Sequence, residues 1–370
     1  MKVVHVEAGR HLFGGARQVL YLLEGLQARR VDSVLVCPRG SAVAAGAREV
    51  GIEVAEIGPN GDLDLRFVGR LRELLANVRP DLVHAHSRRG ADWLGGIAAW
   101  SSGIPAVVSR RVDNPERAWL ARRKYALYDR VVTISEGIAA VVSATGVARD
   151  RVACVPSAVA PAEAQCDRAA FAAEFGVPED VCVLGVVAQM IERKGHRDLL
   201  AALPAIRAAV PGVRVLFFGR GPLESALRRE VAAAGLGDIV QFAGFRSDLS
   251  GWLANLDLLV HPAHMEGLGV ALLEASAAGV AIVAARAGGI PEAVADGANG
   301  RLVEPGDTDA LARRVIELAQ DPDERARLGA GGRRRVAERF SVDAMVDGNL
   351  AVYRAVLAER GVSGATDGHG

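Results

Sequence analysis

Two glutamates flank the stretch of this sequence best suited to holding a phosphorylated ligand. Glu266 and Glu274 stand eight residues apart in EGLGVALLE, with Gly267 and Gly269 between them. The glycines allow close backbone approach, and a helix starting near Val270 would offer unpaired N–H groups to an anion. In helical geometry the carboxylates lie roughly 12 Å apart along the axis, beyond the roughly 5 to 9.5 Å of hydrolytic carboxylate pairs. The stretch favours a long diphosphate ligand over glycoside hydrolysis, although a surface turn and a solvated helix position would also account for it.

A basic turn is the second candidate. Residues 188–196 read AQMIERKGH and follow a predicted strand. Lys194 is suited to neutralise the charge that develops on a departing diphosphate, with Gln189 and Arg193 beside it. An exposed basic pair that opens the next helix would give the same pattern.

The first half of the chain holds weaker candidates. Gly14 and Gly15 follow the first predicted strand in GGAR, which is neither a Walker loop nor GxGxxG, so a simple turn is the alternative. Arg111 is a fixed cation suited to an anionic donor or acceptor. His86 and Arg88, in HAHSRRG, are candidates for contact with an acceptor, while a core histidine and a solvated arginine are the alternative.

The residue pattern indicates neither a metal site nor a cofactor. His261 and His264 flank the Glu266 loop without an HExxH motif. Asp-x-Asp triplets begin at Asp62, Asp307 and Asp321, and we interpret them as caps and turns. The four cysteines are scattered and include no CxxC pair, which predicts reduced thiols. We expect no cofactor and no metal.

Composition points to a globular protein of two domains. The 370 residues are 50% hydrophobic, and 44 Lys and Arg balance 44 Asp and Glu, so nucleic acid is not an expected partner. The sequence contains neither a signal peptide nor a run of roughly 20 apolar residues, which predicts a cytoplasmic protein. Residues 110–130 mix arginines with Trp119 and tyrosines. This mixture fits peripheral contact with an anionic membrane, on the inner face of the cytoplasmic membrane, or a core-facing helix with a basic outer side.

Two sets of short apolar runs alternate with longer helical segments, which is typical of parallel α/β domains. The first set predicts strands at Lys2–Val6, Ser33–Cys37, Asp81–Ala85, Ala106–Ser109, Arg130–Ile134 and Arg151–Val155. The second predicts strands at Val181–Ala188, Arg214–Gly219, Ile239–Ala243, Leu256–His261, Ala281–Ala284 and Gly300–Val303. Each set predicts a doubly wound sheet, and ligands of such sheets bind beyond the carboxyl ends of the strands. The Pro- and Ala-rich stretch 156–167 is the expected linker.

In combination these motifs resemble the retaining glycosyltransferases of family 4, which adopt the GT-B fold. The resemblance covers nearly the whole chain and rests on the E-x7-E element, GRGP at 219–222, FAG at 242–244 and GGIPE at 288–292. It implies an α/β fold of two Rossmann-like parallel-sheet domains facing a central cleft. The expected domains are an acceptor-side domain at 1–160, a donor domain at 161–345 and a C-terminal helix in 346–370 that packs back on the first domain.

The resemblance also implies roles for individual residues. Glu266 contacts the donor sugar, Glu274 holds the ribose, and Lys194 and Arg111 complete the catalytic set. The remaining donor-binding positions are Gly14, Gly15, Gln189, Arg193, Gly267, Leu268 and Gly269, and His86 and Arg88 stand on the acceptor side. Gln189 replaces an arginine and Arg111 a histidine that many relatives carry.

The implied activity is metal-independent, retaining transfer of a sugar from a nucleotide donor, with a UDP-sugar expected. The implied acceptor is a glycan or a lipid-linked glycan, as in lipopolysaccharide or polysaccharide biosynthesis. A sugar-nucleotide epimerase and an inactive nucleotide-sugar-binding subunit are the alternatives.

Overall fold

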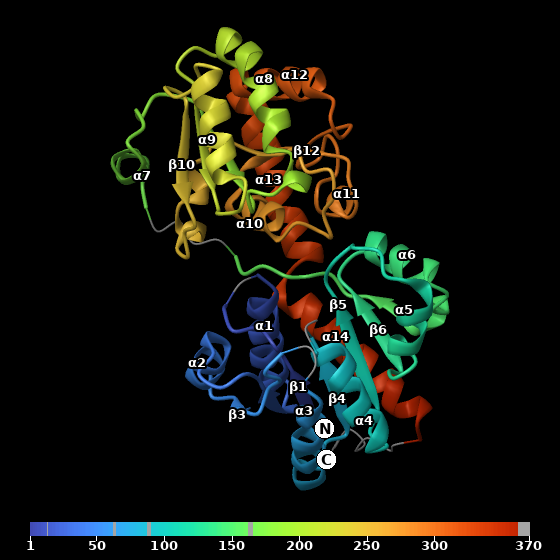
Figure 1. The fold of residues 1–370 in the computed structure, drawn as a ribbon. Helices are drawn as coiled ribbons and strands as arrows, with labels where there is room; N and C mark the ends of the chain where they lie inside the picture. Colours follow the sequence, from blue (N-terminus) through green and yellow to red (C-terminus); the bar gives the residue numbers. More distant parts are fainter. Residues whose placement is uncertain (13, 62–63, 87–89, 162–165, 362–370) are drawn as a thin grey trace. The chain divides into compact units, whose positions relative to one another are not determined.

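The computed structural model (Figure 1) describes residues 1–12, 14–61, 64–86, 90–161 and 166–361. The chain forms two compact units. Unit 1 comprises residues 1–157 and the C-terminal segment from Val342, and unit 2 comprises Ala158–Ser341. The sequence prediction placed the corresponding boundaries at residues 160 and 345.

The sheet of unit 1 is parallel throughout, with the order β3-β2-β1-β4-β5-β6-β7 in the described residues. Its strands are β1 Lys2–Val6, β2 Asp32–Val36, β3 Glu53–Ala55, β4 Leu82–Ala85, β5 Ala106–Arg110, β6 Arg130–Thr133 and β7 Val152–Cys154. Crossover connections between parallel strands are right-handed. The chain moves from β1 to β3 toward one edge of the sheet and from β4 to β6 toward the other edge. The helices of these two sets of connections therefore cover opposite faces of the sheet. The direction reverses between β1 and β4, and the loops after these two strands diverge and leave room for a ligand.

Helices cover both faces of this sheet. They are α1 Gly14–Ala28, α2 Ala42–Glu49, α3 Leu65–Val78, α4 Gly96–Ser101, α5 Ala118–Tyr125, α6 Glu136–Ala144 and α14 Val342–Glu359, with short turns η1 Ala91–Gly95 and η2 Arg149–Arg151. The last helix, α14, packs against α1 (Figure 1). Gly25 of α1 makes this approach close, because a Cβ there would overlap the side chain of Val346. The buried face of α14, which includes Leu350, Tyr353 and Val356, completes the core of unit 1.

Unit 2 repeats the architecture, with the parallel strand order β10-β9-β8-β11-β12-β13 in the described residues. Its strands are β8 Val183–Val187, β9 Arg214–Phe218, β10 Val240–Gly244, β11 Leu258–His261, β12 Ala281–Ala285 and β13 Gly300–Val303. Its helices are α7 Arg168–Phe175, α8 His196–Ala209, α9 Glu224–Ala233, α10 Val270–Ala278, α11 Ile290–Ala293, α12 Thr308–Gln320 and α13 Pro322–Arg339, with short turns η3 Glu192–Lys194, η4 Leu249–Gly251 and η5 Leu253–Asn255. The strand direction reverses between β8 and β11. The predicted α/β fold with two parallel, doubly wound sheets is confirmed.

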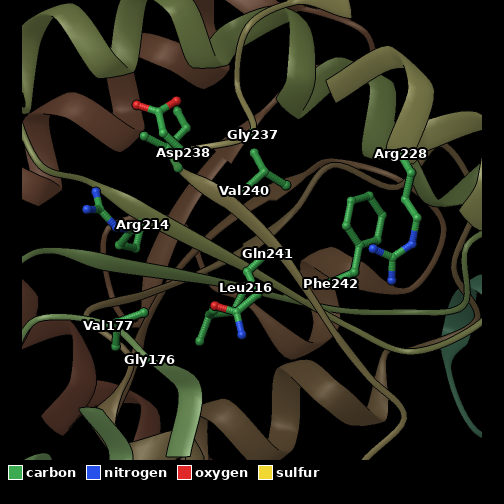
Figure 2. A pocket seen from close by; sticks show the side chains of 11 residues that line it. Gly176, Val177, Arg214, Leu216, Arg228, Gly237, Asp238, Val240, Gln241 and Phe242 are labelled. Carbon is green, nitrogen blue, oxygen red and sulfur yellow. The ribbon is translucent and has the colours of Figure 1, made fainter. Parts of the chain in front are cut away.

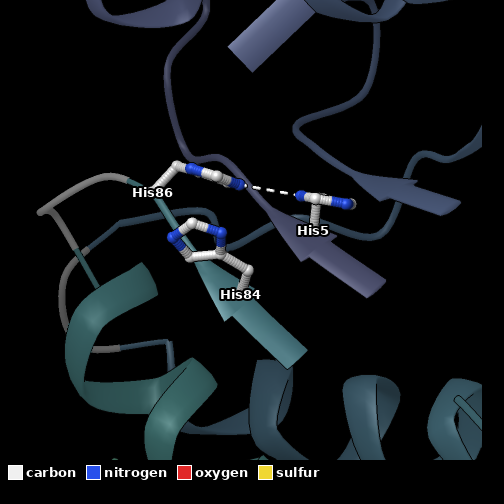
Figure 3. Close-up of side chains that lie close together, drawn as sticks. All are labelled: His5, His84 and His86. Carbon is white, nitrogen blue, oxygen red and sulfur yellow. Dashed lines mark hydrogen bonds between the residues drawn. The ribbon is translucent and has the colours of Figure 1, made fainter. Parts of the chain in front are cut away.

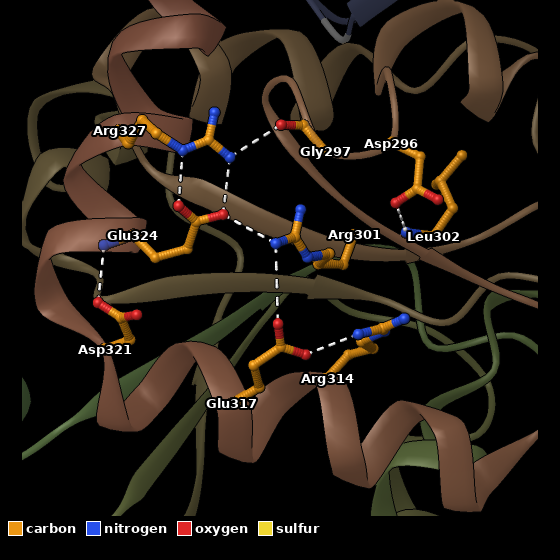
Figure 4. A network of polar contacts seen from close by, with 9 residues as sticks. All are labelled: Asp296, Gly297, Arg301, Leu302, Arg314, Glu317, Asp321, Glu324 and Arg327. Carbon is orange, nitrogen blue, oxygen red and sulfur yellow. Dashed lines mark hydrogen bonds and ion pairs between the residues drawn. The ribbon is translucent and has the colours of Figure 1, made fainter.

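An ion network fixes the last two helices of unit 2 to its edge strand (Figure 4). Arg301 of β13 lies 2.8 Å from Glu324 of α13 and 3.7 Å from Glu317 of α12. Asp321 accepts a hydrogen bond from the Glu324 N–H at 2.9 Å and caps α13, and Asp307 caps α12 in the same way. The cap interpretation of these two aspartates is confirmed. Asp62 lies outside the described residues.

Among the described helices, none is both long enough and apolar enough to cross a membrane.

The apolar core of unit 2 lies between its sheet and the helices on it, and includes Leu203, Phe217, Val260 and Val315.

Candidate donor-binding site

The two strands at the reversal point of unit 2 carry the two strongest sequence candidates. The loop after β8 leads through η3 to Lys194, and the loop after β11 leads to Glu266. Because β8 and β11 are direct neighbours in the sheet, their loops emerge side by side at its carboxyl edge. The site therefore occupies the position where open α/β sheets bind their ligands.

Lys194 and Glu266 form a buried ion pair between the Nζ atom and Oε2. Their side chains retain only 9% and 14% of their accessible surface. Gly195 makes this approach of the two loops possible, because it has a φ of +68° and a Cβ there would overlap the carbonyl oxygen of Pro262. The sequence prediction that these two loops converge agrees with this geometry.

His261 at the end of β11 is the third member of this cluster. Its Nε2 lies 3.0 Å from Oε2 of Glu266, and its side chain is buried. Burial by itself would raise the pKa of Glu266, but the hydrogen bond from His261 and the positive charge of Lys194 outweigh burial and lower that pKa to about 2. Glu266 is therefore a carboxylate that only accepts hydrogen bonds at neutral pH. It follows that His261 carries its proton on Nε2.

The other oxygen of Glu266 turns back on its own loop. Oε1 accepts a hydrogen bond from the Gly267 N–H at 3.1 Å, and the main-chain oxygen of Glu266 accepts one from the Gly289 N–H at 2.9 Å. Gly288, with a φ of +52°, packs directly on that main-chain oxygen, where a Cβ would overlap it. The first two residues of the GGIPE motif thus pack against the backbone of the Glu266 loop. The Gly267 amide, predicted to bind phosphate, is engaged by Glu266 in this arrangement.

Helix α10 starts directly after this loop, as the sequence predicted. Gly269 has a φ of +89° and precedes the first helical residue, Val270, while Leu268 is buried. The first turn of a helix leaves N–H groups without intrahelical acceptors, so this end of α10 can receive an anion. Glu274 lies in the second turn and is partly exposed. Whether Glu274 contacts a ribose stays a prediction.

The remaining candidates of unit 2 lie around Lys194. Gln189 is exposed, and Arg193 donates from Nη1 to the carbonyl oxygen of Met265 at 3.0 Å, so Arg193 ties the two loops together. A pocket of about 450 Å³ has Arg193, His196 and His264 in its wall, but neither Lys194 nor Glu266 lines it. Arg193 therefore has a structural partner in addition to its predicted role toward a diphosphate.

Unit 1 brings three of its sequence candidates to the carboxyl edge of its own sheet. Gly14 and Gly15 are exposed at the start of α1, and the Cδ atom of Arg111 lies 3.9 Å from the position of a Cβ on Gly15. Burial lowers the pKa of Arg111 to about 10, partly offset by the charge of Glu7, so the guanidinium stays positive at neutral pH. Glu7, directly after β1, is buried and accepts from the Gly9 N–H at 2.6 Å.

The two acceptor-side candidates have different outcomes. His86 is 2% exposed, and its Nε2 lies 2.9 Å from Nδ1 of His5, so its ring faces the interior of unit 1. The predicted contact of His86 with an acceptor stays a prediction. Only the small exposed part of its side chain is available for such a contact. Arg88 lies outside the described residues.

The basic segment 110–130 divides between the interior and the surface. Arg110 and Lys124 are buried and pair with Glu116, and Lys124 also lies 3.2 Å from Asp92. Trp119 is 55% exposed, with the Arg123 guanidinium 5.4 Å from its ring centre. Part of the predicted basic surface thus stabilises the fold of unit 1.

A second hollow of about 340 Å³ lies against edge strand β10 in unit 2 (Figure 2). Its wall includes Leu216, Gln241 and Phe242, and the guanidinium of Arg228 lies 4.3 Å from the Phe242 ring centre. Its lining residues come from strands, turns and helix α9, outside the Lys194 and Glu266 loops. This hollow is therefore separate from the candidate donor site.

Two residues of these sites escaped sequence reasoning. His261 was noted only as a neighbour of the Glu266 loop, and Glu7 was not considered. Both come at the end of a strand next to the reversal point of a sheet. That position is the signal by which they could have been found.

Comparison with known proteins gives the same assignment for both halves of the chain. The family model of glycosyl transferases group 1 matches residues 167–335, and that of glycosyltransferase family 4 matches residues 14–163. The D-inositol 3-phosphate glycosyltransferase of Saccharomonospora viridis is 30% identical over 313 residues, which cover 75% of this chain and 70% of that protein.

Two further similarities extend the comparison. The GDP-mannose-dependent monoacylated alpha-(1-6)-phosphatidylinositol monomannoside mannosyltransferase of Corynebacterium glutamicum is 36% identical over 188 residues, which cover 48% of this chain. That match spans about half of the relative's length, 49%. The crystal structure of Anabaena HepE in complex with UDP has a TM-score of 0.84 at 20% identity and covers 96% of this chain and 100% of that one.

Two Rossmann-like units of this topology, together with the similarity to HepE, define the GT-B class of fold. The chain belongs to glycosyltransferase family 4, the glycosyl transferases group 1.

Proposed function

We propose that this protein is a retaining glycosyltransferase that transfers a sugar from a nucleoside diphosphate donor to a glycan or lipid-linked acceptor, without a metal ion in the donor site. The observation that carries the proposal is the buried Glu266 carboxylate, held by Lys194 and His261 at the reversal point of unit 2. Family membership of the chain supports it.

Each member of this cluster has a chemical task in the proposal. Glu266 accepts hydrogen bonds from donor sugar hydroxyls and orients the ring. Lys194 and the first-turn amides of α10 receive the diphosphate, whose negative charge grows as the bond to the anomeric carbon breaks. The acceptor oxygen bonds to that carbon on the face from which the diphosphate departs, and its proton leaves with the diphosphate. On unit 1, Arg111 is the candidate for binding an anionic group of a substrate.

The names of relatives suggest which substrates to test first. The C. glutamicum relative is named for GDP-mannose and a phosphatidylinositol mannoside, and HepE was solved with UDP and with UDP-glucose. GDP-mannose and UDP-glucose are therefore the first donors to test, and a phosphatidylinositol mannoside is the first acceptor. A lipopolysaccharide or polysaccharide precursor is the next acceptor class.

Transfer can be tested with purified full-length protein. Each donor is incubated with each acceptor, products are identified by mass spectrometry, and the anomeric configuration of the new linkage is read by NMR. We expect an acceptor-dependent product with retained configuration. Glu266→Ala and Lys194→Ala should lower turnover by on the order of 100-fold or more, whereas Glu338→Ala, an exposed position on α13, should have wild-type turnover.

Other outcomes would overturn the proposal. A product formed from donor alone would indicate an epimerase. Nucleotide-dependent thermal stabilisation without turnover on any acceptor would indicate a binding subunit. Near-normal turnover of Glu266→Ala would refute the site assignment, and an inverted linkage would refute retention.

Contact with an anionic membrane is also part of this proposal. The exposed side chains Trp119, Arg122 and Arg123 lie on α5. Flotation with vesicles of neutral or anionic phospholipid tests it: we expect binding to the anionic vesicles alone and its loss in Trp119→Ala/Arg123→Ala. Equal recovery with both vesicle types would refute it.

A further inference from the structure

Three histidines from two neighbouring strands meet in the interior of unit 1 (Figure 3). His5 lies on β1 and His84 on β4, and the two are paired directly in the parallel register. The His86 N–H donates to the Val6 carbonyl oxygen at 2.9 Å, which extends this pairing by one residue. Side chains two residues apart on a strand share a face. All three rings therefore lie on the same side of the sheet, and all three are buried.

Each ring brings one nitrogen close to a nitrogen of the other two. The three candidate ligand atoms lie within 4.8 Å of one another, and the His5 Nδ1 to His86 Nε2 distance is 2.9 Å. In a tetrahedral zinc site with Zn–N bonds of roughly 2.0 to 2.1 Å, ligand nitrogens are separated by roughly 3.3 Å. The His5 and His86 nitrogens would separate by a few tenths of an ångström around such an ion, and the His84 ring would adjust its distance to them.

The outer nitrogens of two rings contact serine hydroxyls. Nε2 of His84 lies 2.9 Å from Ser109 Oγ, and Nε2 of His5 lies 3.5 Å from Ser33 Oγ. Histidines that bind a metal usually donate their second ring N–H to an oxygen acceptor, most often a carboxylate, a backbone carbonyl or water, which fixes the tautomer and the ring orientation. A serine hydroxyl can accept in the same way. The Tyr353 hydroxyl of α14 lies 2.5 Å from Nδ1 of His84 and places an oxygen atom, a possible metal ligand, beside the three rings.

The electrostatic setting keeps the rings in their metal-binding form. All three rings are buried, and burial favours the neutral imidazole, which is the form that binds a metal ion. The positive charge of Arg111 also acts on His84 and His86. It opposes a cation here, so the ligands must bind the ion strongly enough to offset that repulsion.

We propose that His5, His84 and His86 form a structural binding site for a divalent transition-metal ion of the zinc type, with the Tyr353 hydroxyl as the candidate fourth ligand. Imidazole nitrogens favour zinc, cobalt, nickel and copper over magnesium and calcium, which prefer oxygen ligands. An ion bound there would join β1, β4 and α14. Its role is to stabilise unit 1, and the inference stands independently of the proposed transfer reaction, whose donor cluster is in unit 2.

A chain of hydrogen bonds among neutral rings would use the same atoms, and the two arrangements differ in their response to a cation. Full-length protein, freed of any affinity tag and treated with EDTA, is titrated with Zn²⁺ and with Co²⁺. We expect one equivalent bound by elemental analysis, visible absorption typical of tetrahedral Co²⁺ and a raised melting temperature. Mg²⁺ should produce none of these changes.

Variants assign the site. His86→Gln should abolish binding of the one equivalent of Zn²⁺. His264→Gln changes a histidine of unit 2 and should leave Zn²⁺ binding unchanged. Ser109→Ala keeps all the ligands and should weaken Zn²⁺ binding by roughly 10- to 100-fold. If His86→Gln does not fold, Ser109→Ala and the wild-type Co²⁺ spectrum still decide the question. Wild-type protein that binds no equivalent of Zn²⁺, or Ser109→Ala with unchanged affinity, would overturn the proposal in favour of the hydrogen-bonded network.

Discussion

His261 Nε2 and Glu266 Oε2 lie 3.0 Å apart at the carboxyl end of β11, where Lys194 reaches the same carboxylate oxygen. One oxygen atom thus accepts from two buried donors, one at the end of β11 and one in the loop after the neighbouring strand β8. This arrangement fixes the direction of the Glu266 side chain before any ligand arrives. Such preorganisation is what a group that orients a reacting sugar requires.

His261 should therefore act as a positioning residue for Glu266. His261→Ala removes the donor that aligns the carboxylate but leaves the Lys194 pair, so we expect kcat to fall by roughly 10- to 100-fold with a smaller change in the donor KM. His261→Gln restores an N–H donor of similar reach and should recover most of the rate. Steady-state kinetics on both variants checks this, and an equal loss in Ala and Gln variants would contradict it.

The pH dependence of stability should report on Glu266. Its pKa of about 2 in the folded protein lies below the ordinary value of 4.5. The contribution of this carboxylate to stability is therefore fully present above about pH 4.5 and is lost as the pH falls toward 2. The melting temperature of the wild type should exceed that of Glu266→Gln most at pH 7, and the gap should narrow by pH 3. A gap that stays constant over this range would contradict the pairing.

Two glycines offer a matched test of the close approach of the Lys194 loop. Gly195 and Gly176 have φ values of +68° and +61°, but a Cβ on Gly195 overlaps the Pro262 carbonyl oxygen, while one on Gly176 meets nothing within 4 Å. Gly176→Ala should cost about 1 to 2 kcal/mol from backbone strain alone and leave transfer unchanged. Gly195→Ala should cost more and also reduce transfer. Denaturant unfolding and turnover measure both, and equal effects of the two substitutions would refute the steric argument.

The packing of α14 on α1 can be tested by rescue. A Cβ on Gly25 would overlap the Cγ2 atom of Val346, so Gly25→Ala should lower the melting temperature although alanine favours helices. Val346→Ala removes the clashing methyl groups and should lower it by loss of packing. The double variant should be more stable than the sum of the two single effects predicts. Additive effects would show that the two helices do not meet at this point.

Much of the fold could be predicted because each buried strand is a short apolar run between turn residues. Lys2–Val6 and Gly300–Val303 coincide with the observed strands. Strand β3, Glu53–Ala55, escaped prediction because its three residues at the sheet edge give no apolar run. The sequence of α5 allowed two interpretations, a membrane-contacting segment or a core-facing helix with a basic outer side. In the structure Lys124 is buried, whereas Arg122 and Arg123 are exposed.

Candidate residues could be predicted where they form a local sequence motif. They could not be predicted where only the pairing of two strands brings distant residues together. The Glu266 loop and the Lys194 turn are local motifs, each after its own strand. His5, in contrast, sits within an apolar strand 79 residues before His84, and only the parallel pairing of β1 with β4 joins them. The contact of Tyr353 with His84 spans 269 residues and depends on where α14 packs.

Helix α14 also affects how the protein is made. Residues 1–157 of unit 1 are translated before unit 2, but the core of unit 1 lacks Leu350, Tyr353 and Val356 until α14 has been translated. Unit 2 is contiguous and is translated in full before that. Of the two units, the one whose translation starts earlier is therefore completed later, because its core is finished only when α14 packs on α1.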